Sequence, residues 1–452
     1  MKRLILIMAM IPLLACNTVT RALMGDPSAT PPPRPTPRPG AAATEPAPRL
    51  TATPFRLGLE RIDPLPTRCS ESPFGLPAEK IVEVAYLPSG FCFNGEIDLF
   101  ETGGHVYAVQ SLGDEAAFFI ADVTEPARPF IVGAWQWNDF TYTADVKTFR
   151  QGSRQFIILS MEPMIKLCGV AIVEVTDPAN PILLENYTSE NTGSADRWCD
   201  SHTTEVSRDE NGNGAFIYVS SIETNDLRLL DIRDLDQVRE INHYTLPDAN
   251  TDRFVHDTTI VGDRVYVAYW SGGAIILDRS EIESGAEAAP LNPAGSIAPE
   301  GLQIHHTFPT TDGKFLFVED EVDYDGERSQ LRLYDIRDLS NPKEALAISL
   351  DQPFSSPHNL LVVGDLLFVG WYSDGVRVFR YDVSDPERPV VEPYAFKATR
   401  PEKTEGVFGS DLYDSIYGVR VRECDLGGQP MLCIYASDLT RGLLVLAMEP
   451  PP

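Results

Sequence analysis

Basic residues are scarce in this chain. Against 66 Asp and Glu there are 37 Lys and Arg, which gives a formal net charge of −29 over 452 residues. A field of this sign repels polyanions, so we expect neither nucleic acid nor an anionic membrane surface as a partner. The charge is compatible with cations, neutral sugars or basic proteins, and also with an acidic surface that only keeps the protein soluble.

Motifs that identify a reaction are also missing. The chain has no P-loop, no GxGxxG following a strand, no nucleophile elbow and no HExxH. It has no CxxC, which argues against a zinc ribbon or a thioredoxin-like redox site. Hydrolase, nucleotide and hydride-transfer chemistries therefore have no positive support.

The N-terminal apolar run, Leu4–Ala15, is too short to cross a bilayer and is typical of an export signal. It ends in Leu-Leu-Ala before Cys16 and so resembles a bacterial lipobox, which implies cleavage before Cys16 and lipidation of that residue. Asn17 favours the outer surface over retention. We expect an exported lipoprotein at the cell envelope or outer surface, which contacts the membrane through its lipid alone. An ordinary secretory signal is the alternative.

Six cysteines remain when Cys16 is set aside, and an even number in an exported chain predicts disulfides. Cys424 and Cys433 flank a turn-rich segment, so we expect this pair to close a hairpin. Proximity in sequence then pairs Cys168 with Cys199 and Cys69 with Cys92.

Composition divides the chain into three parts. Residues 1–15 are the predicted signal peptide. Residues 16–66 carry the lipidated cysteine and a linker rich in Pro and Thr, which has too few apolar residues to fold and should be disordered. Residues 67–452 contain the apolar, strand-forming segments of a single repeat-built domain.

The repeat unit is clearest between residues 255 and 280. Asp257–Val261, Arg264–Trp270 and Gly273–Asp278 read as three strands, because they are rich in β-branched and aromatic residues and are separated by glycine turns. One such unit leaves an apolar face and two open edges, so it needs neighbours of the same kind.

The rest of the chain provides these neighbours. The end of the third strand recurs seven times at intervals of 47 to 65 residues, and in six copies two acidic residues stand three positions apart, as in the turn Asp382-Val-Ser-Asp-Pro386. We assign the turn acids a structural role in preference to calcium binding. The last unit lacks a fourth strand, whereas Ile81–Leu87 is a spare strand ahead of the first. The sequence therefore predicts an all-β fold, a seven-bladed β-propeller closed by an N-terminal strand, over an open solenoid.

The pattern of strand, Gly-Asp, strand and G-x-x-I-x-D-V-S-D-P-x-x-P resembles the LVIVD-repeat proteins. The resemblance covers roughly residues 81–450 and implies a β-propeller at a bacterial or archaeal surface. It implies no reaction. The fourth unit departs from the pattern at Arg279–Gly285, where the turn is altered.

Four of the seven histidines fall at one repeat position, the start of a first strand, with spacings of 54, 50 and 52 residues. They are His202, His256, His306 and His358. First strands are innermost in a propeller blade, so we expect the four imidazoles to face the upper mouth of the central channel. His105, His243 and His305 fall outside this register and receive no role.

Imidazole is a common ligand of Cu, Fe and Zn, and a bound metal would need hydrogen-bond partners that orient each ring. Asp200, Asp257 and Asn359 lie close enough in sequence to orient a ring in this way, and Tyr417, at the aligned position of the seventh blade, is a further candidate donor. The alternative is structural: a repeated histidine can tie an inner strand to the next turn and bind nothing.

Two functions follow from this reading. The first is a lipid-anchored binding or interaction module that acts through its upper face. The second is a metal-dependent oxidoreductase in which the four histidines hold one transition-metal ion. A structural envelope protein without a small ligand is a third, weaker alternative.

Overall fold

The computed structural model describes residues 72–113, 115–137, 141–163, 168–285, 291–298, 301–321, 331–348, 350, 356–400 and 414–451. The predicted signal peptide, Cys16, the whole of the predicted linker and Cys69 lie outside these residues. Within them, no helix is long and apolar enough to span a bilayer.

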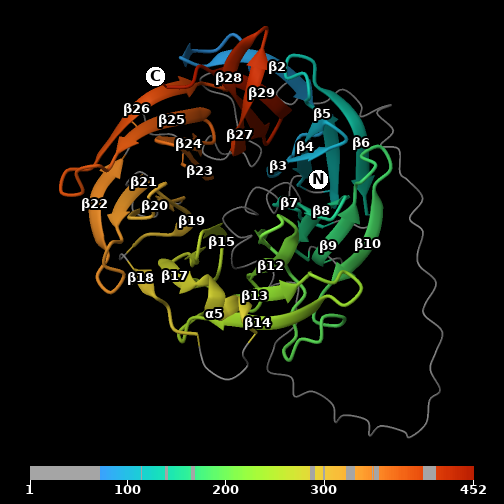
Figure 1. Ribbon diagram of the computed structural model, residues 1–452, viewed down its shortest axis with the longest axis vertical. Coiled ribbons are helices and arrows are strands. Elements are labelled where there is room, and N and C mark those ends of the chain that lie inside the picture. Colours follow the sequence, from blue (N-terminus) through green and yellow to red (C-terminus); the bar gives the residue numbers. More distant parts are fainter. Residues whose placement is uncertain are drawn as a thin grey trace, which may run out of the picture.

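Seven antiparallel sheets form a ring, and each consists of strands that hydrogen-bond in sequence from the channel outward (Figure 1). This confirms the all-β, seven-bladed β-propeller. Blades one to three comprise β3 (Ile97–Thr102), β4 (His105–Leu112), β5 (Ala117–Asp122) and β6 (Phe130–Gln136); β7 (Val146–Gln151), β8 (Arg154–Met161), β9 (Gly169–Glu174) and β10 (Ile182–Tyr187); β11 (Thr203–Arg208), β12 (Gly214–Ser221), β13 (Asp226–Asp231) and β14 (Arg239–Thr245).

The other blades have the same plan, and β1 adds a short fifth strand to blade six. Blades four to seven comprise β15 (Asp257–Val261), β16 (Arg264–Ala268), β17 (Ala274–Asp278) and β18 (Gly295–Ile297); β19 (Ile304–Pro309), β20 (Phe315–Asp320), β21 (Leu331–Asp335) and β22 (Lys343–Ile348); β23 (Leu360–Val363), β24 (Leu366–Gly370), β25 (Val376–Asp382), β26 (Val390–Lys397) and β1 (Ala78–Glu79); β27 (Ile416–Leu426), β28 (Gln429–Asp438), β29 (Gly442–Met448) and β2 (Val82–Pro88).

The N-terminal strand closes the ring. β2 pairs antiparallel with β29, the last strand of the chain, with Val82 opposite Ala447 and Pro88 opposite Gly442. In Figure 1 the blue β2 lies beside the red β28 and β29. The predicted closing strand, Ile81–Leu87, is thus confirmed to within one residue at each end.

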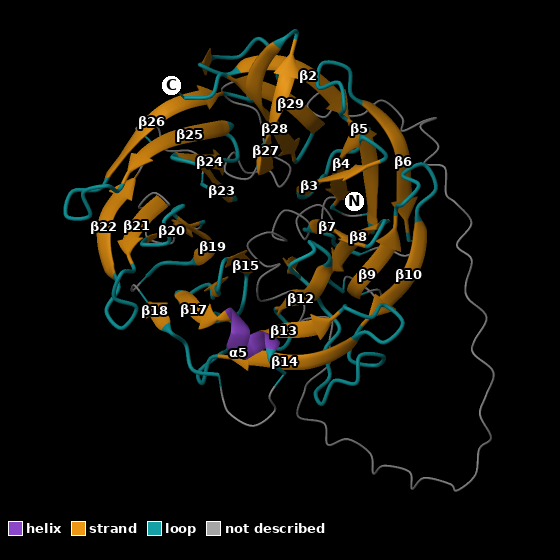
Figure 2. Ribbon diagram, in the orientation of Figure 1, coloured by secondary structure: helices purple, strands orange, loops and turns teal. Residues whose placement is uncertain are grey.

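Blade four shows how local sequence ends the strands. β15 has the predicted bounds, but β16 ends at Ala268, and Trp270 beyond it has a φ of +47°. The altered turn is the short helix α5 (Arg279–Glu283), the helix drawn in Figure 2. The Asp278 side chain accepts the first free backbone N–H groups of α5, as an N-cap residue does.

The core lies between the blades. Apolar residues of each adjacent pair of blades form one buried cluster. Blades seven and one, which meet where the ring closes, also share such a cluster. There Phe119 of blade one packs in the same cluster as Tyr435 and Val445 of blade seven. Each fully buried side chain of this size stabilises the fold by about 1.5–3 kcal/mol relative to an exposed one.

The first strands face the channel, as the labels of β3, β7, β15, β19, β23 and β27 near the centre of Figure 1 indicate. Aspartates tie neighbouring first strands together at this level. Asp98 accepts the backbone N–H of Thr148 at 2.8 Å, and Asp145 accepts that of Thr204 at 2.8 Å. The starts of the first strands therefore meet on one face of the ring.

Two of the three expected disulfides are confirmed. Cys424–Cys433 joins β27 to β28 near their hairpin turn, and Cys168–Cys199 joins the end of the second-to-third-strand loop of blade two to the segment entering blade three. The third expected pair includes Cys69 and stays a prediction.

Closure of the ring can be tested at Gly442. A Cβ at this position would lie 2.5 Å from the backbone nitrogen of Ser89, and the φ is +120°. Gly442→Ala should lower the free energy of unfolding by about 2–5 kcal/mol, as measured by denaturant titration, because it combines left-handed strain with a collision against the end of β2.

Gly428→Ala is the matched control, since Gly428 also has a positive φ but no atom within 4 Å of the added Cβ. Gly428→Ala should lower the free energy of unfolding by only about 1–2 kcal/mol, because it introduces the backbone strain without the collision. Equal losses in the two variants would contradict the role given to the β2–β29 junction.

Candidate functional site

Four histidines from consecutive blades form a continuous arc at the channel. The ring centroids of His202 and His256 are 4.3 Å apart, those of His256 and His305 4.2 Å, and those of His305 and His358 4.1 Å. All four side chains are buried, and none of the residues is more than 6% exposed. We call His202, His256, His305 and His358 the histidine tier.

The tier differs by one residue from the expected set, because it contains His305 instead of His306. In β19 the two histidines together lie opposite a single residue of β20, Glu319, so the strand has a bulge there. A bulge places one extra residue in the strand and turns its side chain in a new direction. Aligning the repeats by sequence could not show this shift.

His306 instead links three blades. Its Nδ1 accepts the backbone N–H of Leu360 at 3.0 Å, so the proton of the neutral ring is on Nε2, 3.1 Å from Oγ1 of Thr259. Both ring nitrogens are therefore used. Burial lowers the pKa of His306 well below its ordinary value, in keeping with a neutral ring. His306 therefore has the structural role that was the alternative to metal binding for the repeated histidines: it ties an inner strand to its neighbours.

His202 begins the tier and is paired with a carboxylate. Its Nδ1 lies 2.5 Å from Oε1 of Glu162, a residue that the sequence analysis did not select. Burial by itself lowers the pKa of His202, but the charge of Glu162 and the bond to it outweigh burial and raise that pKa. A carboxylate on Nδ1 also orients the ring so that Nε2 faces away from it.

His358 at the other end is held by a backbone carbonyl. Its Nδ1 lies 2.7 Å from the carbonyl oxygen of Tyr417, and since a carbonyl only accepts, Nδ1 carries the proton. Burial lowers the pKa of His358 to about 3, so the ring is neutral at physiological pH. Its Nε2 therefore has a free lone pair, which is the form that binds a metal ion.

His256 is incompletely satisfied. Its Nε2 lies 3.0 Å from Nε2 of His202, while its Nδ1 is buried without a hydrogen-bond partner among the described residues. Burial, and then the charge of His202, lowers the pKa of His256 well below its ordinary value. Leaving a buried polar atom unpaired costs about 1–3 kcal/mol, so the arrangement is one that an added ligand would stabilise.

His256, His305 and Glu321 bring their ligand atoms together. One ligand atom from each of these three buried residues lies within 4.8 Å of the other two. Oε2 of Glu321 is 3.8 Å from Nε2 of His305, and its Oε1 accepts the hydroxyl proton of Tyr372 at 2.7 Å. This is the His/Glu cluster of the described residues, and it differs from the expected four-histidine set.

Burial also controls the charge of the cluster. It lowers the pKa of His305 well below its ordinary value, and raises the pKa of Glu321 to about 7. Glu319, beside them, has no exposed surface, and burial raises the pKa of its carboxyl well above the usual range. Its Oε1 lies 3.1 Å from Nδ1 of His305 but not in hydrogen-bond geometry, and within the described parts of the chain neither oxygen has a hydrogen-bond partner.

Four residues around the tier share a repeat position that the sequence analysis overlooked, one or two residues after the end of the second strand of a blade. They are Glu162, Trp270, Glu321 and Tyr372. We call them the roof, because second strands end on the face where first strands begin. Alignment of the second strands could have located this position, but its residue types vary too much to identify it as functional.

The expected outer partners take other roles. Asp200 accepts the hydroxyl of Ser221 at 2.6 Å and the backbone N–H of Ile222 at 2.7 Å, and so organises a loop. Asp257 is nearest to His306, at 3.9 Å, and Asn359 donates to Glu96. Tyr417 does contact the tier. Besides its carbonyl bond, its ring centroid is 4.0 Å from that of His358.

A small cavity of about 10 Å³ lies beside the tier. It is lined by all four tier histidines, and on its other sides by residues that include Ala144, Asp145, Asp257, Asn359 and Tyr417. A space of this size corresponds to one water-sized particle.

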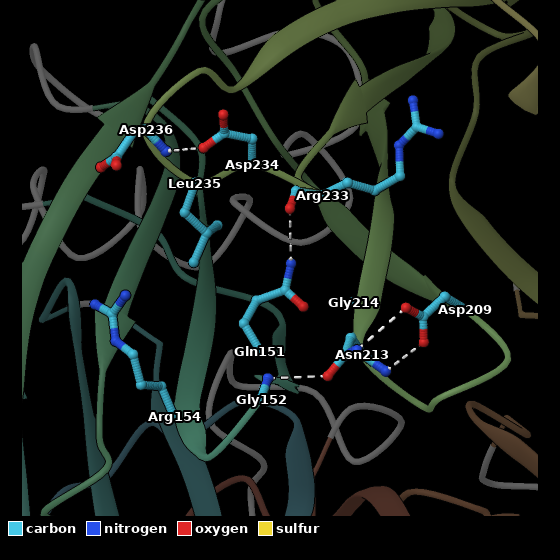
Figure 3. A pocket seen from close by; sticks show the side chains of 10 residues that line it. All are labelled: Gln151, Gly152, Arg154, Asp209, Asn213, Gly214, Arg233, Asp234, Leu235 and Asp236. Carbon is cyan, nitrogen blue, oxygen red and sulfur yellow. Dashed lines mark hydrogen bonds between the residues drawn. The ribbon is translucent and has the colours of Figure 1, made fainter.

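A larger cavity of about 390 Å³ lies between blades two and three, where the turns following β7 and β11 meet (Figure 3). Its arginines are already paired, Arg154 with Glu174 and Arg233 with Asp231. The asparagine and aspartate at its edge, Asn213 and Asp209, bond to each other. Its polar groups are thus satisfied within the protein, which makes the axial cluster the stronger candidate site.

No protein-family model matches the chain, and no match was found among the curated proteins.

Because His306 bonds to residues of both neighbouring blades, its removal should destabilise the fold. His306→Ala leaves the buried N–H of Leu360 without its partner, removes the N–H that Thr259 Oγ1 accepts and creates a cavity, so it should lower the free energy of unfolding by about 2–4 kcal/mol. The matched control is His243→Ala, since the side chain of His243 is 45% exposed; it should change that energy by less than about 0.5 kcal/mol. Similar values for both variants would contradict the interblade role.

The Glu162–His202 pair predicts a pH-dependent contribution to stability. Because the pKa of His202 is raised in the folded state, the pair stabilises the metal-free protein most below the unfolded-state pKa of histidine. That contribution disappears as the pH rises through the folded-state pKa. The stability difference between wild type and Glu162→Gln should therefore shrink between about pH 5.5 and about pH 8.5. A difference that is constant or grows over this range would contradict the pairing.

Proposed function

We propose that this protein is a metal-binding β-propeller in which His256, His305 and Glu321 hold one transition-metal ion at the channel. The observation that carries the proposal is the convergence of three buried ligand atoms within 4.8 Å of one another. Two imidazoles and one carboxylate are a ligand set that leaves coordination positions open, as in non-haem iron oxygenases. Copper, iron and zinc all accept such ligands.

The protonation states support this assignment. The pKa values of His256 and His305 lie well below the ordinary value, so both rings are neutral and each has a lone pair. Binding an ion at His305 through Nε2 would leave its Nδ1 proton facing the carboxyl group of Glu319, a common arrangement around metal-bound histidine. A bound cation would also lower the pKa of Glu321 and favour the carboxylate.

His202 and His358 support the centre from either side. Both use Nδ1 for an outer partner, Glu162 in one case and the Tyr417 carbonyl in the other. The 3.0 Å between the Nε2 atoms of His202 and His256 is close to the separation of about 3 Å between neighbouring nitrogen ligands that bond at about 2.0–2.1 Å. His202 is thus placed to become a fourth ligand with little movement.

The metal would supply Lewis-acid or one-electron redox chemistry, which makes a metal-dependent oxidoreductase the enzymatic form of the proposal. The protein's own residues would hold the ion, keep water away from it and fix the ligand protonation.

A β-propeller is also compatible with an interaction module, the other predicted function. An apolar patch on the upper face, where the tier lies, would favour it. Among the described residues, however, the large exposed hydrophobic side chains lie at starts of fourth strands or at the end of a first strand, on the opposite face: Val82, Phe130, Ile182, Val261 and Val390. The geometry therefore favours the metal centre.

The cellular setting is part of the proposal. We infer that the chain is exported, cleaved before Cys16 and lipid-anchored at the cell envelope or outer surface, and that its repeats are of the LVIVD type. The lipobox-like sequence and the two disulfides support export, since disulfides persist in oxidising compartments. No nucleic-acid partner is proposed, in keeping with the net charge of −29.

Metal content tests the proposal directly. Protein purified without a polyhistidine tag should contain about one Cu, Fe or Zn ion per chain by elemental mass spectrometry, and His305→Ala should lose most of it. His306→Ala is the matched control, an adjacent histidine that should keep the metal while losing stability. Metal-free wild-type protein that takes up no added Cu, Fe or Zn, or metal lost from His306→Ala but kept by His305→Ala, would overturn the assignment.

A further inference from the structure

The upper side of the histidine tier is closed by two aromatic roof residues. The ring of Trp270 stacks on His256, with centroids 4.9 Å apart and planes at 19°, and the ring of Tyr372 lies 4.7 Å from His358. Trp270 is 4% exposed and Tyr372 3% exposed. These aromatic groups thus shield the imidazoles on which they pack.

Both aromatic residues have strained backbones. The φ of Trp270 is +47° and that of Tyr372 is +29°, values that bulky residues rarely adopt. The surrounding structure compensates, because the carbonyl of each accepts a backbone N–H of the next blade: Ile304 bonds to Trp270 and Ile416 to Tyr372, both at 3.2 Å. Strain maintained in this way indicates that the two rings have fixed positions over the tier.

The side of the tier that faces into the channel is lined by polar groups that bond to one another. Asn359 donates to Glu96, and Lys147 bonds to Asp145. A methyl group added at Gly418 would come within 1.7 Å of Oε1 of Glu96. A methyl group therefore does not fit between Gly418 and Glu96.

The space left beside the cluster is the cavity of about 10 Å³, which is enough for one water-sized particle. We propose that the open coordination positions of the metal take only small inorganic molecules, such as dioxygen or azide, whose donor atom fills this space, and that Trp270 and Tyr372 exclude organic substrates. This inference rests on the proposed metal centre and defines the substrate class of that centre.

The consequence is a restriction on reaction class. An organic substrate cannot reach the ion, so inner-sphere chemistry at this centre is confined to dioxygen and other small inorganic ligands. Trp270 and Tyr372 act as a size filter, a role distinct from holding the ion.

The test uses the Co²⁺-loaded protein, whose visible spectrum responds to a new ligand on the metal. Azide should shift the spectrum of the wild-type protein, whereas imidazole, a five-membered ring, should not. In Trp270→Gly imidazole should bind at least about tenfold more tightly than in wild type, because loss of the indole opens space above His256. Glycine also relieves the strain at the positive φ, which favours folding of the variant.

Tyr372→Gly provides a second opening with the same relief of strain, and Trp137→Ala, a tryptophan of blade one away from the tier, is the control that should remain closed to imidazole. Imidazole binding to wild type as readily as azide, a wild-type spectrum unmoved by azide, or both glycine variants closed to imidazole would each overturn the size filter. Cobalt content is measured in every sample. If the protein takes up no cobalt, the proposed metal centre itself is wrong. If it binds cobalt but admits imidazole as readily as azide, only the size filter is wrong.

Discussion

Pairing of β2 with β29 is the contact on which the rest of the structure depends. Without it the seventh blade would have three strands and an open edge, and the cluster that joins blades seven and one would lose part of its cover. Closure of the ring brings all first strands to a common axis. Residues about fifty positions apart in sequence then become neighbours, which is why histidines of four consecutive blades lie with ring centroids 4.1–4.3 Å apart.

Burial then determines the chemistry at that axis. It holds the pKa of His256, His305 and His358 below the ordinary value and raises the pKa of Glu319 and Glu321. Such a set of neutral imidazoles, beside a Glu319 carboxyl whose oxygens have no hydrogen-bond partner among the described residues, is unfavourable in a dry interior. A bound cation would satisfy these groups together, which is the physical reason to prefer a metal centre over a purely structural cluster.

The repeats allowed most of the fold to be predicted, including the number of blades, the closing strand and the two described disulfides. Three of the four tier histidines also follow from their spacing. His305 does not, because the bulge in β19 exchanges it with His306, and a bulge depends on strand pairing that no repeat alignment contains. Glu321 is one acid within the run Glu319-Asp320-Glu321, and only the geometry distinguishes it.

Neighbouring residues of one strand therefore have different roles, His306 in joining blades and His305 in the cluster. The most direct test of this account is a crystal structure of the metal-loaded protein. Anomalous diffraction would be recorded at the absorption edge of the bound element. The account predicts one anomalous peak at about 2.0–2.3 Å from a ligand atom of each of His256, His305 and Glu321. A loaded crystal with no peak at this position, or with its peak on His306, would contradict it.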